Sequence, residues 1–328
     1  MLGTSAQIDG SRHERCERLI VAARRLQPVV TAVAHPCDEA SLQSAVEAAR
    51  LGIITPIFVG PRRKVHSAAA KAGIDLTRYE CIDAAHSHDA AAKAVELVTL
   101  GCAEALMKGS LRADELMAAV VRRDTGIRTA RRISHCFVMD VPGHTNALIV
   151  SDAALNLAPT LEEKADIVQN AIDLARALGA EEVRVAILGA VETVHSRIPS
   201  TVEAAALCKM ADRGQITGAV LDGPLALDSA ISLGAPAIKP MVSPVAGRAS
   251  VLIAPDQEAG NMLVKGLSLL AGADAAGIVL GARVPVILTS RTDSELTRLA
   301  SCAIAVLVAA ARRANVAVTA EASQTQAE

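Results

Sequence analysis

The chain alternates short runs of β-branched residues with Ala- and Leu-rich segments of helical length. This alternation is typical of parallel strands joined by crossover helices, and it disfavours a helix bundle or an all-β sandwich. The sequence therefore predicts an α/β fold. The predicted strands are residues 29–34, 56–59, 105–107, 147–150, 183–188, 219–221, 250–253 and 284–289.

Two segments carry a helix-start pattern in which Ser or Thr is followed three residues later by Glu. Thr160 and Glu163 open one predicted helix, and Gly179 is placed to end it. Ser200 and Glu203 repeat the pattern before a second predicted helix.

Composition excludes several classes of function. With 33 Lys+Arg against 35 Asp+Glu, the formal net charge is -2, so the chain has no overall positive field for nonspecific binding of nucleic acid. Phe58, Tyr79 and Phe137 are the only aromatic residues, which leaves little for base stacking. The length of 328 residues predicts two domains or one large α/β unit, but no Gly/Ser-rich linker marks a boundary.

The cysteines and the N-terminal residues indicate the cellular compartment of the protein. The seven cysteines are scattered without a C-x-x-C pair, which favours reduced thiols over disulfides or a zinc site. The polar start lacks the apolar core of a signal peptide, and the longest apolar run, 303–311, is shorter than the roughly 20 residues of a membrane span. We expect a cytoplasmic protein that does not insert into a membrane.

Ligands of open α/β sheets bind beyond the carboxyl ends of strands, so strand-to-helix turns are the candidate sites. The turn after residues 284–289 delivers Ser290 and Arg291 just before a long predicted helix. A hydroxyl, a guanidinium and a helix N-terminus suit an anion such as phosphate. The alternative is an ordinary solvated Arg beside a helix cap.

Two further turns carry polar residues. Gly260 permits close approach of a ligand or another backbone, and Asn261 offers a donor and an acceptor, although both also fit an ordinary helix start. Lys108 and Gly109 end another predicted strand without the pattern of a P-loop. The basic cluster at residues 122–132 is either a solvated surface or a docking strip for polyphosphate.

Several kinds of site have no signature. The eight histidines form neither H-E-x-x-H nor a 2-His-carboxylate pattern, so we expect no catalytic metal. No G-x-S-x-G elbow marks a covalent acyl-enzyme, and no strand is followed by the dinucleotide fingerprint G-x-G-x-x-G.

Taken together and in order, the motifs resemble the phosphate acetyl/butyryl transferase family over nearly the whole chain. They are LMKG at 106–109, GIRTARRISH at 126–135, SDAALN at 151–156, KMADRGQITG at 209–218, LDGPLALD at 221–228, SPVAG at 243–247, PDQEAGNML at 255–263 and LTSR at 288–291.

The resemblance implies two α/β domains with a cleft between them, as in isocitrate and isopropylmalate dehydrogenases. The first would be 1–138 plus 281–328 and the second 139–280. It also implies a homodimer and reversible acyl transfer between CoA and inorganic phosphate, with acetyl as first choice and butyryl as second. CoA and phosphate are substrates, and the reaction needs no cofactor, metal or covalent enzyme intermediate.

By the same resemblance, Arg291 neutralises the phosphoryl group and Ser290 hydrogen-bonds the reacting centre. The expected substrate-binding residues of the cleft are Lys108, Gly109, Ser134, Asp228, Gly260 and Asn261.

The chain departs from the family at three positions. Acetyl-specific members carry a candidate base, an Asp, where Thr297 stands, so the role passes to Asp293, with Glu295 in reserve. The alternatives are that Asp293 only caps the helix and that the base lies elsewhere. Leu269 replaces an Arg that helps to hold CoA, and Ala153 replaces a cysteine found in some members. Residues 126–135 and 209–218 lean toward the butyryl branch and toward chains fused to an enoyl-CoA hydratase domain.

Two alternatives remain open from the sequence. One is a noncatalytic regulator that binds CoA or acyl phosphate, favoured by the missing Asp. The other is a metal-dependent hydroxy-acid dehydrogenase of the same fold, which would need paired aspartates for Mg²⁺, and Asp212 and Asp222 lack that spacing.

Overall fold

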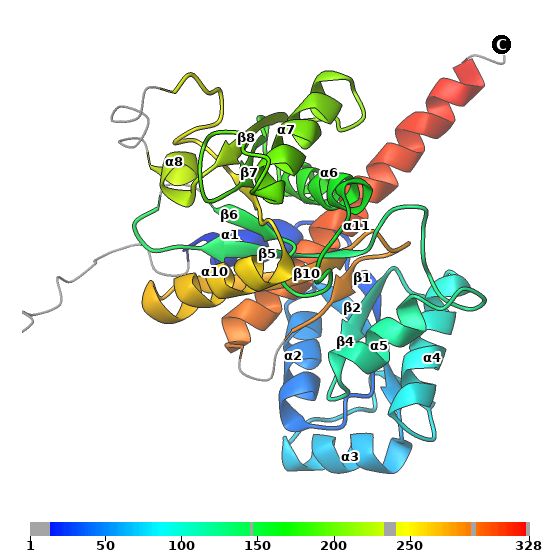
Figure 1. Ribbon diagram of the computed structural model, residues 1–328. Coiled ribbons are helices and arrows are strands. Elements are labelled where there is room, and N and C mark those ends of the chain that lie inside the picture. The colour runs from blue at the N-terminus through cyan, green and yellow to red at the C-terminus, as the bar shows by residue number, and fades with distance from the viewer. Residues whose placement is uncertain (1–13, 145–146, 233–240, 290–292, 326–328) are drawn as a thin grey trace, which may run out of the picture. The chain divides into compact units, whose positions relative to one another are not determined.

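The computed structural model describes residues 14–144, 147–232, 241–289 and 293–325, the side chains being described as far as residue 314 (Figure 1). The chain has a mixed α/β fold, as the alternating sequence predicts. The helices are α1 (Glu14–Ala23), α2 (Glu39–Arg50), α3 (Arg62–Lys71), α4 (Ser87–Thr99), α5 (Ala113–Val120), α6 (Leu161–Ala177), α7 (Pro199–Asp212), α8 (Leu227–Ile231), α10 (Gln257–Leu270) and α11 (Glu295–Thr325).

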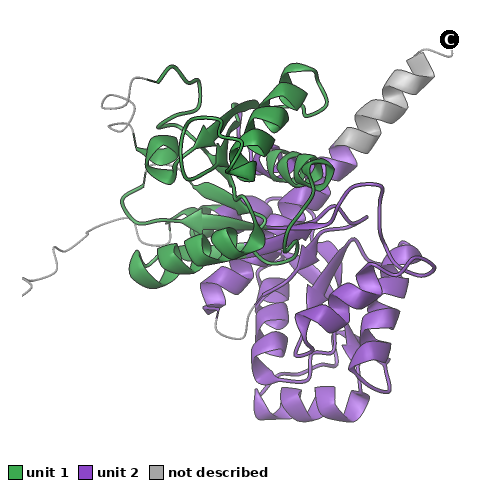
Figure 2. Cartoon of the chain, viewed as in Figure 1, with its two compact units in different colours: residues 1–18, 136–172, 182–276 green, residues 19–135, 173–181, 277–328 purple. Residues whose placement is uncertain are grey.

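The chain divides into two compact units (Figure 2). Unit 1 contains residues 1–18, 136–172 and 182–276, and unit 2 contains 19–135, 173–181 and 277–328. The domain division expected from the sequence, 1–138 plus 281–328 and 139–280, stays a prediction.

In unit 2 the strand order is β3-β2-β1-β4-β11-β10. The strands are β1 (Val29–Ala34), β2 (Ile54–Gly60), β3 (Glu80–Asp83), β4 (Ala105–Lys108), β10 (Asp274–Leu280) and β11 (Val286–Ile287), and β10 belongs to unit 2 from Gly277 onward. All neighbours from β3 to β11 pair in parallel, while β10 runs antiparallel to β11. The carboxyl ends of β1, β4 and β11 therefore lie at one edge.

Helices on both faces explain why the central strands of unit 2 are apolar. α2 packs with α3 and α11, and α4 packs with α5 on the other face (Figure 1). Strand β1 is buried almost throughout, and Leu106 and Met107 of β4 are fully buried. Parallel strands covered on both faces read as continuous apolar runs, which made them predictable.

In unit 1 the strand order is β5-β6-β9-β7-β8. The strands are β5 (Ser134–Asp140), β6 (Leu148–Ser151), β7 (Arg184–Leu188), β8 (Val220–Leu225) and β9 (Val251–Ile253). Only the β5 and β6 pair is antiparallel among these neighbours. The hydrophobic core of unit 1 contains Met139, Leu148, Val150, Leu252 and Val264.

The two predicted helix starts have different outcomes. The capping box at α6 is confirmed, because the Thr160 N–H donates to Glu163 at 3.0 Å and the Glu163 N–H donates to Thr160 Oγ1 at 3.3 Å. The prediction for Ser200 is wrong. Pro199 already begins α7, and Glu203 instead accepts a salt bridge from Lys164.

Candidate active site at the carboxyl edge of unit 2

The end of β4 brings Lys108 and Gly109 to the carboxyl edge. The Gly109 N–H donates to Ala34 O at 2.8 Å, and a Cβ at Gly109 would lie 2.5 Å from that oxygen, so only glycine fits without a shift of the backbone. Lys108 Nζ donates to Gly109 O at 3.1 Å. The strand thus presents an ammonium group beside a closely packed turn.

Ser110 continues this turn and ties it to the loop after β1. Its hydroxyl donates to His35 O at 2.8 Å and lies 3.0 Å from His35 Nδ1. His35 has a positive φ of 54°, which is uncommon for a residue other than glycine. Burial, and next the charge of Lys64, lower the pKa of His35, so the neutral imidazole is favoured in the folded chain.

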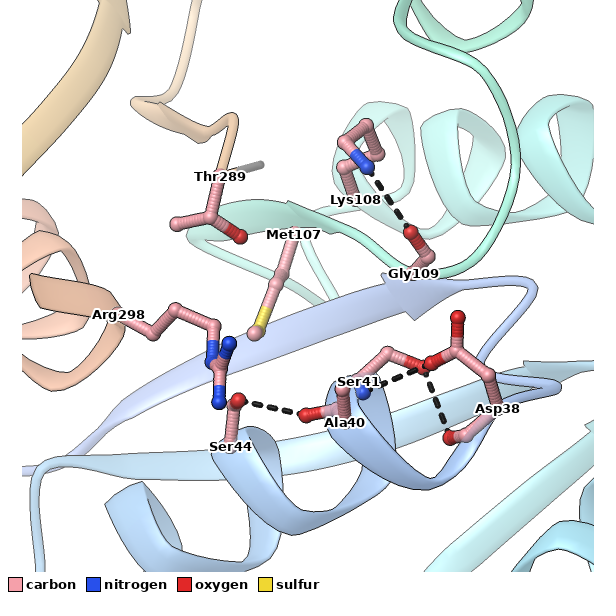
Figure 3. Close-up of a pocket in the computed structure, with 9 residues that line it drawn as sticks. All are labelled: Asp38, Ala40, Ser41, Ser44, Met107, Lys108, Gly109, Thr289 and Arg298. Carbon is pink, nitrogen blue, oxygen red and sulfur yellow. Dashed lines mark hydrogen bonds between the residues drawn. The ribbon is translucent and has the colours of Figure 1, made fainter. Parts of the chain in front are cut away.

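A small pocket of about 20 Å³ lies at this edge, with Thr289 from the segment after β11 and Arg298 from α11 among its lining residues (Figure 3). Arg298 extends from α11 toward α2, where Ser44 lies. The residues that line the pocket are Asp38, Ala40, Ser41, Ser44, Met107, Lys108, Gly109, Thr289 and Arg298.

Arg298 is a site residue that sequence reasoning missed. Its Nη1 donates to Asp293 O at 2.6 Å, and its buried Nε has no hydrogen-bond partner among the described residues. A signal did exist, because a cation within the first turn of a helix is opposed by the helix dipole. An anion in the pocket would satisfy both the buried Nε and the positive helix end.

Ser290 and Arg291 lie outside the described residues, between Thr289 and Asp293. Asp293 is half-buried. The cap of α11 belongs to Ser294, whose Oγ accepts the Thr297 N–H at 3.1 Å. Thr297 is buried at 5% exposure, and its Oγ1 lies 3.0 Å from the Ser294 hydroxyl.

Gly260 and Asn261 lie on α10 in unit 1. A Cβ at Gly260 would meet Asp152 O at 2.4 Å, so the close approach at this glycine is made by backbone. Asn261 Nδ2 donates to Ala153 O at 3.0 Å, which fixes its amide against the loop after β6. The Asp152 carboxylate accepts from the Ala154 N–H at 2.8 Å.

The two remaining candidates have contrasting surroundings. Ser134 is fully buried at the start of β5, whose first two residues belong to unit 2 and the rest to unit 1. Asp228 is exposed on the first turn of α8 in unit 1.

In the basic cluster at residues 122–132, Arg122 pairs with Asp124 at 3.0 Å and Arg131 pairs with Asp173 at 2.5 Å.

The buried thiols are poor nucleophiles. Burial raises the pKa of Cys136 and Cys302 to about 12, and burial likewise raises the pKa of Cys37 to about 11. Of the seven free cysteines, Cys102 is the exposed one. Ala153 is fully buried.

The described residues contain neither a metal-binding cluster nor a membrane-spanning helix. No three His, Cys, Asp or Glu side chains gather there in a way that would hold a metal ion. Within the same residues, none of the helices combines the length and the apolar character of a membrane span.

Comparisons with known proteins give a consistent match. Residues 85–306 match the family described as Phosphate acetyl/butaryl transferase. A phosphate acetyltransferase of Rhizobium meliloti is 64% identical over 298 residues, which cover 91% of this chain and 94% of the relative. A phosphate butyryltransferase of Clostridium acetobutylicum is 40% identical over 289 residues, 88% of this chain and 95% of the relative. The crystal structure of a branched-chain phosphotransacylase from Enterococcus faecalis V583 matches with a TM-score of 0.75 at 27% identity, over 86% of this chain and 99% of that one.

Proposed function

The chain belongs to the phosphate acetyl/butyryl transferase family, and from that premise we propose that it transfers an acyl group reversibly between CoA and inorganic phosphate. Acetyl is the first choice and butyryl the second, in line with the names of the relatives at 64% and 40% identity. The observation that carries the proposal is the pocket that Lys108, Arg298 and Thr289 line together at the carboxyl edge of unit 2.

In the direction of acyl-CoA formation, the CoA thiol loses its proton to a base and its sulfur attacks the carbonyl carbon of the acyl phosphate. A C–S bond forms, the C–O bond to the phosphoryl group breaks, and inorganic phosphate leaves. Fixed donors stabilise the negative charge that develops on the carbonyl oxygen. The step needs both substrates together and no covalent enzyme intermediate, cofactor or metal.

We assign Arg291 to the phosphoryl group, because a planar guanidinium grips two oxygens at once. Ser290 hydrogen-bonds the reacting centre. The proposed substrate-binding residues are Lys108, Gly109, Ser134, Asp228, Gly260 and Asn261.

We propose Asp293 as the base, with Glu295 in reserve. Thr297 cannot accept the proton at a useful pKa, and its hydroxyl is engaged with Ser294 in the helix cap. Because Ser294 provides that cap, the Asp293 carboxylate is not needed for it.

Arg298 joins the proposed site as a residue that binds phosphate and positions Asp293. Its hydrogen bond to Asp293 O ties the loop to α11, while its Nε remains available for an anion. Lys108 supplies a second positive charge from the end of β4.

Three further properties stay proposals. We propose two domains that face each other across a cleft, like those of isocitrate and isopropylmalate dehydrogenases. We propose a homodimer, supported by the exposed apolar side chains Met262, Leu269 and Leu270 on α10. The free cysteines support a reducing compartment, the cytoplasm.

The deciding experiment mixes acetyl-CoA or butyryl-CoA with inorganic phosphate and follows the release of free thiol. Wild type should release thiol only when phosphate is present. Arg291→Lys should remain folded but lose on the order of 10²-fold in turnover, and Ser290→Ala should also fall sharply. A chain that binds CoA without releasing thiol from either acyl-CoA would instead be the noncatalytic regulator.

A further inference from the structure

A larger cavity in unit 2 lies between the start of α2 and the helix α3. Its volume is about 630 Å³, which falls within the range of roughly 300–1,000 Å³ of small-molecule sites. Because α2 follows β1 and α3 follows β2, it lies at the carboxyl edge of parallel strands, where such sheets bind ligands. The cavity is lined by Cys37, Asp38, Glu39, Ala40, Arg63, Lys64, Ser67, Ala68 and Lys71.

One face of α3 gives this cavity its positive charge. Lys64, Ser67 and Lys71 are spaced three and four residues apart and so share a helix face, and Arg63 adjoins them. Within the described part of the chain, the charged groups of Arg63, Lys64 and Lys71 form no side-chain hydrogen bond and no ion pair. By contrast, Lys93 on α4 pairs with Asp89 at 3.2 Å. Unpaired cations in a concave site suit an anionic ligand.

The start of α3 adds to this preference. Pro61 precedes the helix and provides no side-chain cap, and the first turn contains no acidic residue. The Asp83 carboxylate, from the end of β3, accepts the Arg62 N–H at 2.8 Å and takes one of the free N–H groups, so the preference for an anion rests mainly on the side chains of Arg63, Lys64 and Lys71. A cation-rich first turn opposes the positive end of the helix dipole, and a bound anion beside these side chains would add to the compensation that Asp83 already gives.

The opposite wall of the cavity carries carboxylates. Asp38 caps α2 by accepting the Ser41 N–H at 2.9 Å, and the neighbouring Glu39 is exposed on the first turn of α2. A carboxylate is a good acceptor for sugar hydroxyls, as in dinucleotide sites. The cavity is larger than inorganic phosphate requires. The cations on one wall suit the phosphate of a nucleotide, and the carboxylate on the other wall suits its sugar.

We propose that this cavity binds a phosphate-bearing nucleotide, with Lys64, Lys71 and Arg63 on the phosphate and Glu39 at the sugar. The same chemistry is offered by the nucleotide end of CoA and by a free nucleotide. The cavity shares Asp38 and Ala40 with the pocket that contains Lys108. Because the two pockets share lining residues, the nucleotide end of CoA is the favoured ligand over a free nucleotide. Only this preference for CoA rests on the proposed function; the binding of a nucleotide does not.

The test titrates the full chain with adenosine 3′,5′-bisphosphate by calorimetry at low salt. Wild type should show saturable binding, and Lys64→Gln and Lys71→Gln should each weaken it about tenfold or more, as expected for the loss of a charge-assisted hydrogen bond. Lys209→Gln, at an exposed lysine on α7, is the matched control and should bind like wild type. Circular dichroism checks that every variant is folded. Undetectable binding to wild type, or unchanged affinity in both variants, would overturn the proposal.

A second titration, in the presence of saturating CoA, distinguishes the two sources. If CoA displaces the bisphosphate, and Lys64→Gln raises the KM for CoA but not for dephospho-CoA, the cavity holds the nucleotide end of CoA. If both ligands bind together, the cavity takes a separate nucleotide. A chain that binds the bisphosphate but transfers no acyl group would overturn the proposed function and leave this inference standing.

Discussion

Arg298 Nη1 donates a 2.6 Å hydrogen bond to the backbone carbonyl of Asp293. The donor lies in the first turn of α11, and the acceptor lies in the loop just before it. A side chain that lines the pocket therefore also holds the residue proposed as the base. Because the acceptor is a backbone carbonyl, changing the Asp293 side chain leaves this hydrogen bond in place, whereas changing Arg298 removes it. Substitutions at the two residues therefore separate the proposed base from the residue that positions it.

Asp293→Asn tests the base. The amide keeps the size of the side chain and loses its basicity, so turnover should fall by on the order of 10²-fold at pH 7 with an unchanged Tm. The measurement is free-thiol release from pH 6 to 8.5. Turnover within about threefold of wild type across this range would show that the thiolate forms without Asp293.

Arg298→Gln tests whether Arg298 binds phosphate in the pocket. We expect the KM for phosphate to rise about tenfold or more, since one charge-assisted hydrogen bond is lost, while Arg298→Lys should recover part of it. Arg112→Gln is the control, because Arg112 is exposed and pairs only with Asp114 among the described residues. Equal effects of the Gln and Lys variants on both KM values would argue for a purely structural role.

Thiol reagents should leave turnover intact. Burial holds the pKa of Cys16, Cys136 and Cys302 at about 12, so at pH 7.5 these thiols remain protonated. Cys102 is exposed and should react first. Mass spectrometry after brief alkylation should find the label on Cys102, with turnover unchanged within about twofold. Loss of turnover on labelling a single other cysteine in the folded protein would require a catalytic thiol.

Two glycines of α10 should respond in opposite ways to alanine. At Gly260 the new Cβ would lie 2.4 Å from Asp152 O, so the free energy of unfolding should fall by about 1–3 kcal/mol. At Gly266 nothing lies within 4 Å, and Gly266→Ala should stabilise the chain by about 0.5–1 kcal/mol. Urea unfolding measures both. A Gly260→Ala variant as stable as wild type would show that the loop after β6 yields easily.

His35 should make stability depend on pH. Burial lowers its pKa in the folded chain, so as pH falls the unfolded chain binds the proton first. The contribution is complete above about pH 6.5 and is lost as pH falls below it. His35→Asn, which tolerates the positive φ, should reduce the loss of stability between pH 7.5 and pH 5.5. His88→Asn, at an exposed helix position, should not, and equal pH dependence of the two variants would contradict the assignment.

Buried parallel strands were predictable from the sequence, because a strand covered on both faces must be apolar throughout. β1 and β9 lie where their apolar runs indicated. β3 is only partly buried, and β5 opens with Ser134 and His135, polar residues that hide its strand character. β10 opens with Asp-Ala-Ala-Gly, a composition without β preference.

The site was predictable where it depends on local chemistry. Lys108 and Gly109 could be placed at a strand end from their own neighbourhood, and the geometry of β4 agrees. For Arg298 the local signal was a cation in the first turn of a helix, but its place in the pocket could not be predicted, because that depends on β11 pairing beside β4, a contact between distant parts of the chain. Local patterns do not specify such pairings.

The pairing of Leu106 with Val286 has a consequence for synthesis on the ribosome. About 180 residues separate the two strands, and at roughly 5–20 residues per second their translation takes on the order of ten seconds or more. Throughout that time β4 can pair with β1 on one side only, and its other side presents open backbone donors and acceptors. Until β11 emerges, this edge of β4 is therefore open to pairing with strands of other chains, which is an aggregation hazard during synthesis.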